Sequence, residues 1–414
     1  MAKTRQTLLV AIREYGLPHE PWMRRQMSGL SSFDVQVMCW KRSSLELFNH
    51  HPIPEAAIHI LNSEVAPYDS RKRWFYRLAN LSGGNFYAAL GEERREVTEL
   101  IRTVNPSAIL CYDGDIALRL VDVAQRLQIP LIAYFHGDFR FNFNRWYRWS
   151  LESRADRFDA VIVVTQQERA WMLEHGVPDR NLHVIPCGAP TSIFIPRDEK
   201  RQSSAAARRQ EEIRFVMASR LADEKGCRES ILAFANVALQ RNNVCLHIYG
   251  DGAERRNLEL LVEARGLRNI VKFHGYVDPQ TMIAELPECD VFIQHSLRKE
   301  GAPVSIAEAM SCGLPVVATA VGGNVDLVVD DCTGFIVAQH DITAMSRAML
   351  RLAEDATLRK LFGQNGRKRA AELFDSSVLT DRLRQLVVDI SGSQPDFGAR
   401  ITHERQLASG SSSG

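Results

Sequence analysis

Two glutamates, Glu300 and Glu308, lie eight positions apart in a segment that also holds helix-starting and helix-ending residues. Pro303 suits the first position of a short helix, because it lacks only an N–H group that would be unpaired there. Gly313 suits the left-handed residue after the helix, and Pro315 prevents its continuation. The segment therefore predicts a loop with Glu300 and a helix with Glu308. The helix N-terminus between them offers free N–H groups to a phosphate or a sugar oxygen.

The alternative for the two glutamates is an ordinary amphipathic helix with two solvated acids. That alternative fits Glu308 poorly, because its neighbours in the sequence are apolar: Ile306, Ala307, Ala309 and Met310. The flanking residues therefore favour a binding function for the pair over a surface helix.

Two cations, Arg220 and Lys225, form a second candidate cluster directly after a predicted strand of the second half of the chain. Fixed cations can stabilise the negative charge that grows on a departing nucleoside diphosphate without a metal ion. The alternative is a surface loop with unremarkable charges. The position at the end of a strand, upstream of Glu300 and Glu308, favours the site.

The elements that must position these residues alternate between short β-branched runs and longer amphipathic segments, which is typical of parallel sheets wrapped by helices. In the first half we predict strands at 8–11, 35–39, 108–112, 131–135, 160–164 and 184–185. In the second half we predict them at 215–218, 246–249, 271–273, 291–293, 316–318 and 335–337. Ligands bind such sheets outside the carboxyl ends of the strands, so two sheets in tandem would share a cleft.

Length and composition bound the class of protein. A chain of 414 residues fits two domains, and its net charge of +1 argues against a dedicated nucleic-acid binder. No run is long and apolar enough for a membrane span, and we expect no signal peptide. The eight cysteines include no C-x-x-C pair, which favours buried, reduced thiols over disulfides or a zinc site.

The domain boundaries follow from a charged segment in the middle of the chain and an apolar pattern near its end. Residues 196–210 contain few large apolar side chains and are predicted to be an exposed linker. We therefore expect an N-terminal domain over 1–196 and a C-terminal domain over 211–375. A final helix is predicted over 376–390, followed by a disordered tail over 391–414.

The glutamate segment resembles the signature of the retaining glycosyltransferases of family 4, and the match extends over nearly the whole chain. The resemblance implies the α/β fold called GT-B, with two Rossmann-like parallel-sheet domains that face a central cleft. It places Glu300 against the hydroxyls of the donor sugar, Glu308 on the ribose, and Arg220 and Lys225 on the diphosphate. The loop and helix start would also bind the donor, through Gly301, Ala302, Val304 and Ser305. In this family the final helix often crosses back to the N-terminal domain.

Two further segments of the second half are predicted to approach the nucleotide. Gly250 ends a predicted strand, and the turn that it begins lacks the third glycine of a dinucleotide fingerprint. We interpret it as a turn that lets the backbone approach the nucleotide. His274 and Gly275 follow the next strand and resemble the family segment whose backbone lies against the base.

The first half offers three candidate residues for the acceptor side. His136 and Asp138 follow a strand in an element similar to the histidine-glycine-x-aspartate element of some exopolysaccharide-building members, here one residue shorter. The resemblance places the histidine near the transferred sugar, although a histidine after a strand can also be a structural hydrogen-bonder. Glu20 precedes the first helix and either faces the acceptor or caps the first turn of that helix.

An Asp-x-Asp pair, Asp113 and Asp115, invites a metal-binding interpretation. Metal-dependent glycosyltransferases with this motif have a single-domain fold of another kind, so we predict a turn here and no metal site. Two stretches, 71–77 and 139–149, mix basic with aromatic residues. They suit a peripheral contact with a membrane or stacking on carbohydrate, and equally a helix that buries half of its aromatic rings.

Together these features predict a retaining, metal-independent glycosyltransferase of the hexosyltransferase type. It would move a sugar from a nucleotide diphosphate sugar, with no other cofactor, to a glycan or lipid-linked acceptor in cell-surface polysaccharide or glycoconjugate biosynthesis. We expect it in the cytoplasm, at the inner face of the membrane, with no nucleic-acid partner. The alternatives are another GT-B enzyme, such as a sugar-nucleotide epimerase or a phosphorylase, and a non-catalytic nucleotide-sugar-binding protein.

Overall fold

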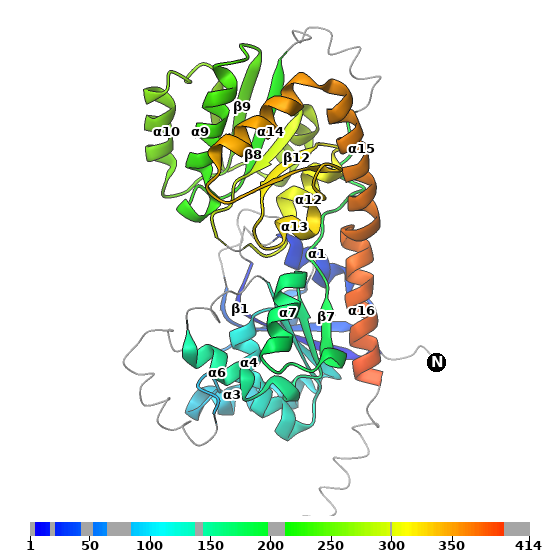
Figure 1. The fold of residues 1–414 in the computed structure, drawn as a ribbon. Coiled ribbons are helices and arrows are strands. Elements are labelled where there is room, and N and C mark those ends of the chain that lie inside the picture. The colour runs from blue at the N-terminus through cyan, green and yellow to red at the C-terminus, as the bar shows by residue number, and fades with distance from the viewer. Residues whose placement is uncertain are drawn as a thin grey trace, which may run out of the picture.

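Two parallel sheets, one in each half of the chain, organise the molecule (Figure 1). The computed structural model describes residues 5–16, 21–42, 53–63, 84–136, 144–197, 212–298 and 300–392. No helix in these ranges is both long and apolar enough to cross a lipid bilayer. All eight cysteines are free thiols, and all but Cys289 and Cys332 are buried.

The N-terminal sheet has seven strands in the order β3-β2-β1-β4-β5-β6-β7. Its strands are β1 (Thr7–Tyr15), β2 (Asp34–Arg42), β3 (Ile58–Ile60), β4 (Ala108–Cys111), β5 (Leu131–Phe135), β6 (Ala160–Val163) and β7 (Leu182–Val184). The six strands predicted in this half are all present. The edge strand β3 was missed, because three residues show no measurable alternation.

Both faces of the N-terminal sheet are buried, as expected where strands carry continuous apolar runs. Leu9 and Ala11 of β1 point into the core on one face, whereas Leu8 and Val10 point into the core on the other. The first face is covered by α3 (Gly91–Val104), α4 (Gly114–Leu127), α6 (Arg145–Glu152) and α7 (Gln166–Glu174). The second is covered by α1 (Pro21–Gly29) and by α16 (Ser376–Gly392), the last helix of the chain.

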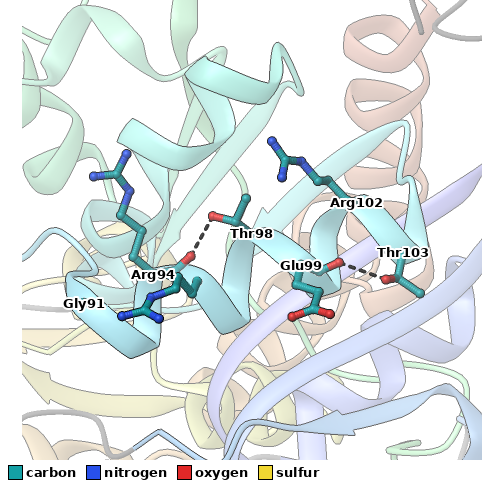
Figure 2. Close-up of a pocket in the computed structure, with 7 residues that line it drawn as sticks. Gly91, Arg94, Thr98, Glu99, Arg102 and Thr103 are labelled. Atoms are coloured by element: carbon teal, nitrogen blue, oxygen red, sulfur yellow. Dashed lines mark hydrogen bonds between the residues drawn. The ribbon is translucent and has the colours of Figure 1, made fainter. Parts of the chain in front are cut away.

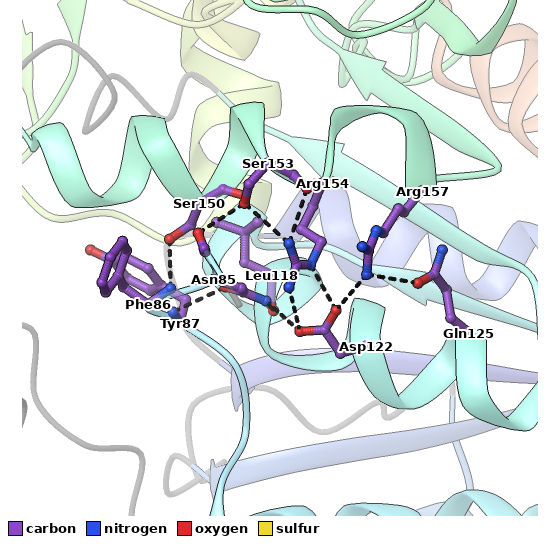
Figure 3. A network of polar contacts seen from close by, with 11 residues as sticks. Asn85, Phe86, Tyr87, Leu118, Asp122, Gln125, Ser150, Ser153, Arg154 and Arg157 are labelled. Carbon is purple, nitrogen blue, oxygen red and sulfur yellow. Dashed lines mark hydrogen bonds and ion pairs between the residues drawn. The ribbon is translucent and has the colours of Figure 1, made fainter. Parts of the chain in front are cut away.

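A polar network fastens α6 and the segment before α3 to α4 (Figure 3). Asp122 of α4 accepts hydrogen bonds from Arg154 Nε at 2.7 Å, Arg157 Nη1 at 3.2 Å and Asn85 Nδ2 at 3.0 Å. The Ser150 hydroxyl of α6 accepts the N–H of Phe86 at 2.8 Å. These bonds satisfy buried polar groups and lock the helical layer on this face of the sheet.

The C-terminal sheet has six strands in the order β10-β9-β8-β11-β12-β13. Its strands are β8 (Ile213–Ala218), β9 (Val244–Tyr249), β10 (Val271–Gly275), β11 (Val291–Gln294), β12 (Val316–Thr319) and β13 (Gly334–Val337). All six were predicted. Its helices are α9 (Cys227–Ala238), α10 (Arg255–Ala264), α11 (Pro279–Glu285), α12 (Val304–Ser311), α13 (Asn324–Leu327), α14 (Ile342–Glu354) and α15 (Ala356–Leu373).

Short 3₁₀ turns connect several of these elements. They are η1 (Glu55–Ala57), η2 (Ala155–Arg157), η3 (Asp179–Asn181), η4 (Asp223–Lys225) and η5 (Leu286–Glu288). Helices α9, α10 and α14 cover one face of the C-terminal sheet, and α12, α13 and α15 cover the other.

The chain passes between the two halves at two adjacent points. Ala189 and Asp375 form a β-bridge, and the Asp375 carboxylate accepts the N–H of Thr191 at 3.2 Å. After this bridge α16 runs back along the N-terminal half beside α1 (Figure 1). The helix continues to Gly392, two residues beyond the predicted end, and Ser391 is buried. The rest of the predicted tail, 393–414, residues 198–210 of the predicted linker and residue 211 lie outside the described residues.

Candidate functional site

The carboxyl ends of the two sheets face each other. Gln166, just after β6, donates its backbone N–H to the Asp326 carboxylate of α13 at 2.8 Å. Ala302 and Val304, which follow β11, pack against the apolar cluster that contains α1. Figure 1 shows α1 and α7 on the side of the N-terminal half nearest α12 and α13. The predicted site residues therefore come from loops that meet between the sheets.

Glu300 is held by three hydrogen bonds in the loop between β11 and α12. Lys225 Nζ donates to Oε1 at 2.7 Å and to Oε2 at 2.8 Å, and the Ser296 hydroxyl donates to Oε1 at 2.8 Å. The side chains of Lys225 and Glu300 are only 18% and 12% exposed. Two residues that were predicted to serve different parts of the donor are thus a direct, partly buried ion pair.

Backbone contacts fix the relative position of the two loops that carry this pair. The Leu297 N–H donates to the Glu224 carbonyl at 2.9 Å, which joins the Lys225 loop to the Glu300 loop. Gly226, directly after Lys225, has φ +59°, and a Cβ there would lie 1.7 Å from the His295 carbonyl oxygen. Only glycine fits this contact, because it combines a left-handed backbone with the closest approach.

A glycine pair after β12 supports the same loop from the other side. The Gly323 N–H donates to the carbonyls of Glu300 at 3.2 Å and Gly301 at 3.1 Å. A Cβ on Gly323 would lie 2.4 Å from the Gly301 carbonyl oxygen. Ser296 and the two glycines, Gly322 and Gly323, were not predicted to belong to the site. Adjacent glycines directly after a buried strand were a usable signal for the glycines.

Helix α12 begins at Val304, one residue later than predicted. Pro303 is its N-cap, with φ −63° and ψ 114°, and its carbonyl accepts the Ile306 N–H at 3.1 Å. The prediction was wrong by one position because proline's fixed φ suits the cap as well as the first turn. The leading N–H groups of the helix belong to Val304 and Ser305, next to Glu300. The left-handed Gly313, with φ +76°, is confirmed.

Glu308 lies on α12 and is partly buried at the boundary between the two halves. Burial raises the pKa of its carboxyl from 4.5 to about 7, and Arg25 of α1 opposes this rise from the other half of the molecule. The carboxyl is therefore close to half-protonated at neutral pH. In this state it can both donate a hydrogen bond to a hydroxyl group and accept one.

Arg220 is not brought together with Lys225 and Glu300. Its side chain is 65% exposed, and its Nη2 donates to Glu224 Oε1 at 3.1 Å. The predicted pair of cations thus consists, in this structure, of one lysine at the glutamate and one arginine directed to solvent. Sequence spacing could not reveal this difference, because both residues belong to one short loop.

The two predicted nucleotide-side glycines meet at the ends of neighbouring strands. The Gly250 N–H donates to the Gly275 carbonyl at 2.8 Å, and both residues have positive φ angles, +126° and +73°. The His274 ring turns away from this contact. Its Nε2 lies 3.1 Å from His247 Nδ1, and it stacks on Tyr249 at 4.4 Å between ring centroids.

His136 follows β5 in an aromatic cluster on the N-terminal side. Its ring lies 4.2 Å from the Trp22 ring and 3.9 Å from the Tyr134 ring, measured between centroids. Its Nδ1 is 3.5 Å from Cys187 Sγ, whereas its Nε2 is shielded from solvent and has no hydrogen-bond partner. Burial lowers the pKa of His136 to about 3, so the imidazole is neutral at physiological pH.

The remaining candidates of the first half divide into residues that cannot be placed and residues with other roles. Glu20 and Asp138 lie outside the described residues. Asp113 is the N-cap of α4, and Asp115, fully buried in the first turn of that helix, forms an ion pair with Arg13. The predicted turn is therefore the start of a helix, and the Asp113 carboxylate accepts the Arg13 N–H at 3.3 Å.

A surface depression lies over α3, away from all of these residues (Figure 2). Its volume is about 860 Å³, and its lining consists of Gly91, Arg94, Arg95, Thr98, Glu99, Arg102 and Thr103. The two threonine hydroxyls donate to carbonyls of the same helix. A depression formed by one helix face, without converging groups from other elements, has none of the features of a substrate site.

Comparisons with known proteins agree with this geometry. Residues 197–369 match the family described as glycosyl transferases group 1, and residues 33–193 match Glycosyltransferase Family 4. An uncharacterized glycosyltransferase of Methanocaldococcus jannaschii is 25% identical over 218 residues, which are 52% of this chain and 55% of that protein. The capsular polysaccharide biosynthesis glycosyltransferase CapM of Staphylococcus aureus is 30% identical over 171 residues, 40% of this chain and 43% of that protein. The chain thus spans about half the length of these curated relatives.

Among solved structures, Anabaena HepE in complex with UDP superposes with a TM-score of 0.75 at 19% sequence identity. The superposition covers 93% of this chain and 100% of HepE. At this identity the likeness establishes the fold, which is GT-B, as predicted. The half of the chain that carries the Lys225–Glu300 pair thus matches the glycosyl transferases group 1, and the half that carries His136 matches Glycosyltransferase Family 4.

Proposed function

We propose that this protein is a retaining glycosyltransferase that moves a sugar from a nucleotide diphosphate sugar to a glycan or lipid-linked acceptor, in the synthesis of a polysaccharide or glycoconjugate. The observation that carries the proposal is the Lys225–Glu300 pair beside the N-terminus of α12, with Glu308 further along the same helix. The name of the relative CapM supports a polysaccharide product.

The leaving group determines what these residues must do. As the bond between the anomeric carbon and the phosphate oxygen breaks, negative charge grows on the diphosphate. Lys225 and the leading N–H groups of α12 are fixed beforehand and can stabilise that charge without reorganisation. Glu300 would then bind the sugar hydroxyls, and Glu308 the ribose.

A front-face displacement accounts for retention. The acceptor oxygen forms its bond to the anomeric carbon on the side from which the diphosphate leaves, and its proton passes to a phosphate oxygen of the leaving group. The described residues then act by positioning and by charge, and the site between the sheets excludes water from the reacting carbon. His136, neutral and with a free Nε2, is proposed to hydrogen-bond the transferred sugar.

We propose that no divalent metal takes part, because the Lys225 ammonium and the helix N–H groups can stabilise the charge of the diphosphate. Asp115 of the Asp-x-Asp pair is occupied by its ion pair with Arg13. The proposal predicts full activity in excess chelator, whereas a strict requirement for Mg²⁺ or Mn²⁺ would contradict it.

The defining experiment is a panel of nucleotide sugars. Thermal stabilisation and slow hydrolysis are measured with UDP- and GDP-linked hexoses, and the UDP sugars are tested first because HepE was crystallised with UDP. We expect one base to stabilise the protein and one sugar to be hydrolysed with retention of anomeric configuration. Inversion, or no response to any nucleotide sugar, would contradict the proposal.

A further inference from the structure

Arg25 of α1 is a partly buried cation at the boundary between the two halves. Its Nε and Nη2 atoms have no accessible surface and no hydrogen-bond partner. Buried guanidinium groups are normally paired with carboxylate, phosphate or carbonyl oxygens, because an unpaired buried charge is costly. Arg25 therefore presents two directed donors whose partner is not another described residue.

The surroundings of Arg25 place it opposite the proposed donor site. The titratable groups that act on it are Glu308 of α12, Cys187 after β7, and its neighbour Arg24. Cys187 in turn touches His136 at 3.5 Å. Arg25 thus lies between the C-terminal residue proposed to bind ribose and the N-terminal histidine proposed to face the sugar.

Glu308 does not neutralise Arg25 in the usual way. No ion pair within 4.0 Å joins the two side chains in the described part of the chain, and burial keeps the Glu308 carboxyl partly protonated at neutral pH, since its pKa is about 7. On the same helix, Gln26 Oε1 is also buried without a partner. Arg25 therefore offers more hydrogen-bonding capacity at this boundary than the described residues satisfy.

The sequence assigned the second cation of the diphosphate site to Arg220, which lies in solvent and is paired with Glu224. One cation, Lys225, remains beside Glu300 on the C-terminal side. A diphosphate carries more than one negative charge, and a guanidinium fork can bind two phosphate oxygens at once.

We propose that Arg25 forms a phosphate-binding subsite on the N-terminal side of the boundary. The phosphate belongs either to the donor diphosphate or to a phosphate of a lipid-linked acceptor, and the planar fork of Arg25 binds it opposite α12. The inference rests on the proposed function only for which molecule supplies the phosphate. The phosphate-binding subsite itself does not depend on that function.

The test is calorimetric titration of Arg25→Ala and Arg25→Lys with UDP, GDP, the two parent nucleosides and a short-chain prenyl phosphate. If the donor supplies the phosphate, Arg25→Ala should bind the diphosphate about tenfold to a hundredfold more weakly, the range expected for a lost charge-assisted bond, with nucleoside affinity unchanged. Arg25→Lys should retain part of the affinity. If the acceptor supplies it, the loss should appear with the prenyl phosphate alone.

Arg268→Ala is the matched control, since it removes the same charge from a side chain that is 69% exposed. Thermal melting of each variant separates loss of binding from loss of fold. Unchanged affinity of a folded Arg25→Ala protein for both kinds of phosphate would overturn the subsite. A wild-type protein that binds prenyl phosphate but no nucleoside diphosphate would instead contradict the proposed function. The titrations of the Arg25 variants with prenyl phosphate would then decide whether Arg25 binds phosphate.

Discussion

The two sides of the domain boundary differ in how far their polar groups are satisfied. On the C-terminal side, Glu300 accepts three hydrogen bonds from Lys225 and Ser296, and backbone bonds from Gly323 hold its loop. On the N-terminal side, Arg25, Gln26 and His136 each have a buried polar atom without a partner. The C-terminal half has exceptions of its own, since both ring nitrogens of His295, Asn324 Oδ1 and Ser230 Oγ are buried without a partner.

This difference indicates that the two sides of the boundary have different functions in ligand binding. A site whose charges are already paired and positioned can receive its ligand with little reorganisation, which suits the donor. A surface with unsatisfied buried donors gains most when a ligand, or movement of the two halves, supplies the missing partners. We therefore expect the C-terminal side to bind nucleotide alone, and the N-terminal side to act when donor and acceptor are both present.

The largest effect should follow from Glu300→Gln. The substitution preserves size but removes the charge that faces the developing oxocarbenium, so turnover should fall by about a hundredfold or more. Nucleotide affinity should change little, because the groups proposed to bind the diphosphate, Lys225 and the leading N–H groups of α12, are retained. Steady-state kinetics beside calorimetry separates the two quantities, with the exposed Glu372→Gln as control. Near-normal turnover of Glu300→Gln would refute the catalytic assignment.

Lys225→Ala tests whether the C-terminal side of the boundary, where Lys225 and Glu300 are already paired, is also the side that binds the nucleotide. Loss of one charged hydrogen-bond donor should weaken nucleoside diphosphate binding by about tenfold to a hundredfold. The melting temperature should also fall, since Glu300 would remain partly buried without its main partner. Lys368→Ala, an exposed lysine of α15, should change neither quantity. Unaltered nucleotide affinity would remove Lys225 from the donor site.

Glu308 links the two sides through a dependence on pH. Its pKa is 4.5 in the unfolded chain and about 7 in the folded protein. The folded state therefore holds the proton more tightly. This contribution to stability is complete below pH 4.5 and is lost as the pH rises to about 7. Between these pH values the melting temperature of Glu308→Gln should fall less than that of the wild-type protein, and the two decreases should differ by about 2 °C or more. Glu308→Gln should also bind nucleotide more weakly. The same dependence of melting temperature on pH in the wild-type protein and in Glu308→Gln would contradict the raised pKa of Glu308.

The smallest effect concerns α6 on the N-terminal half. Trp149 is 46% exposed there, next to Trp146, over which Arg145 stacks at 4.6 Å. If this helix meets a membrane, the protein should pellet with anionic vesicles at low ionic strength and be released by salt. Trp149→Ala should weaken pelleting a few-fold, and Leu239→Ala, on the C-terminal half, should not. Absence of pelleting would favour a glycan acceptor free in solution.

Local patterns predicted most of the fold. All twelve predicted strands exist, because most of them are buried and apolar, and the glycine after α12 adopts its left-handed conformation. The pair of glutamates was also located correctly on a loop and a helix. The strand that was missed, β3, is three residues long and lies at the sheet edge.

What local patterns could not predict are contacts between distant segments. The Lys225–Glu300 pair joins residues 75 positions apart, and the sequence assigned them to different parts of one ligand. Arg25 belongs to an amphipathic helix whose pattern does not reveal which side faces the other half of the molecule. Arg220 is the opposite case, in which a predicted position is not used as expected. An arginine is present at the predicted position, but its side chain is directed to solvent.

The return of α16 to the first half means that the N-terminal folding unit is not continuous in sequence. Leu379, Leu383 and Val387 complete an apolar core with Met23 and Met27 of α1. A fragment that stops at the linker would lack this helix and expose the surface that it covers, whereas the complementary fragment would carry the helix unprotected. Each fragment should aggregate when produced alone. Produced together, they should reassemble without a covalent link, and the linker then becomes a natural place to divide the protein into two interacting pieces.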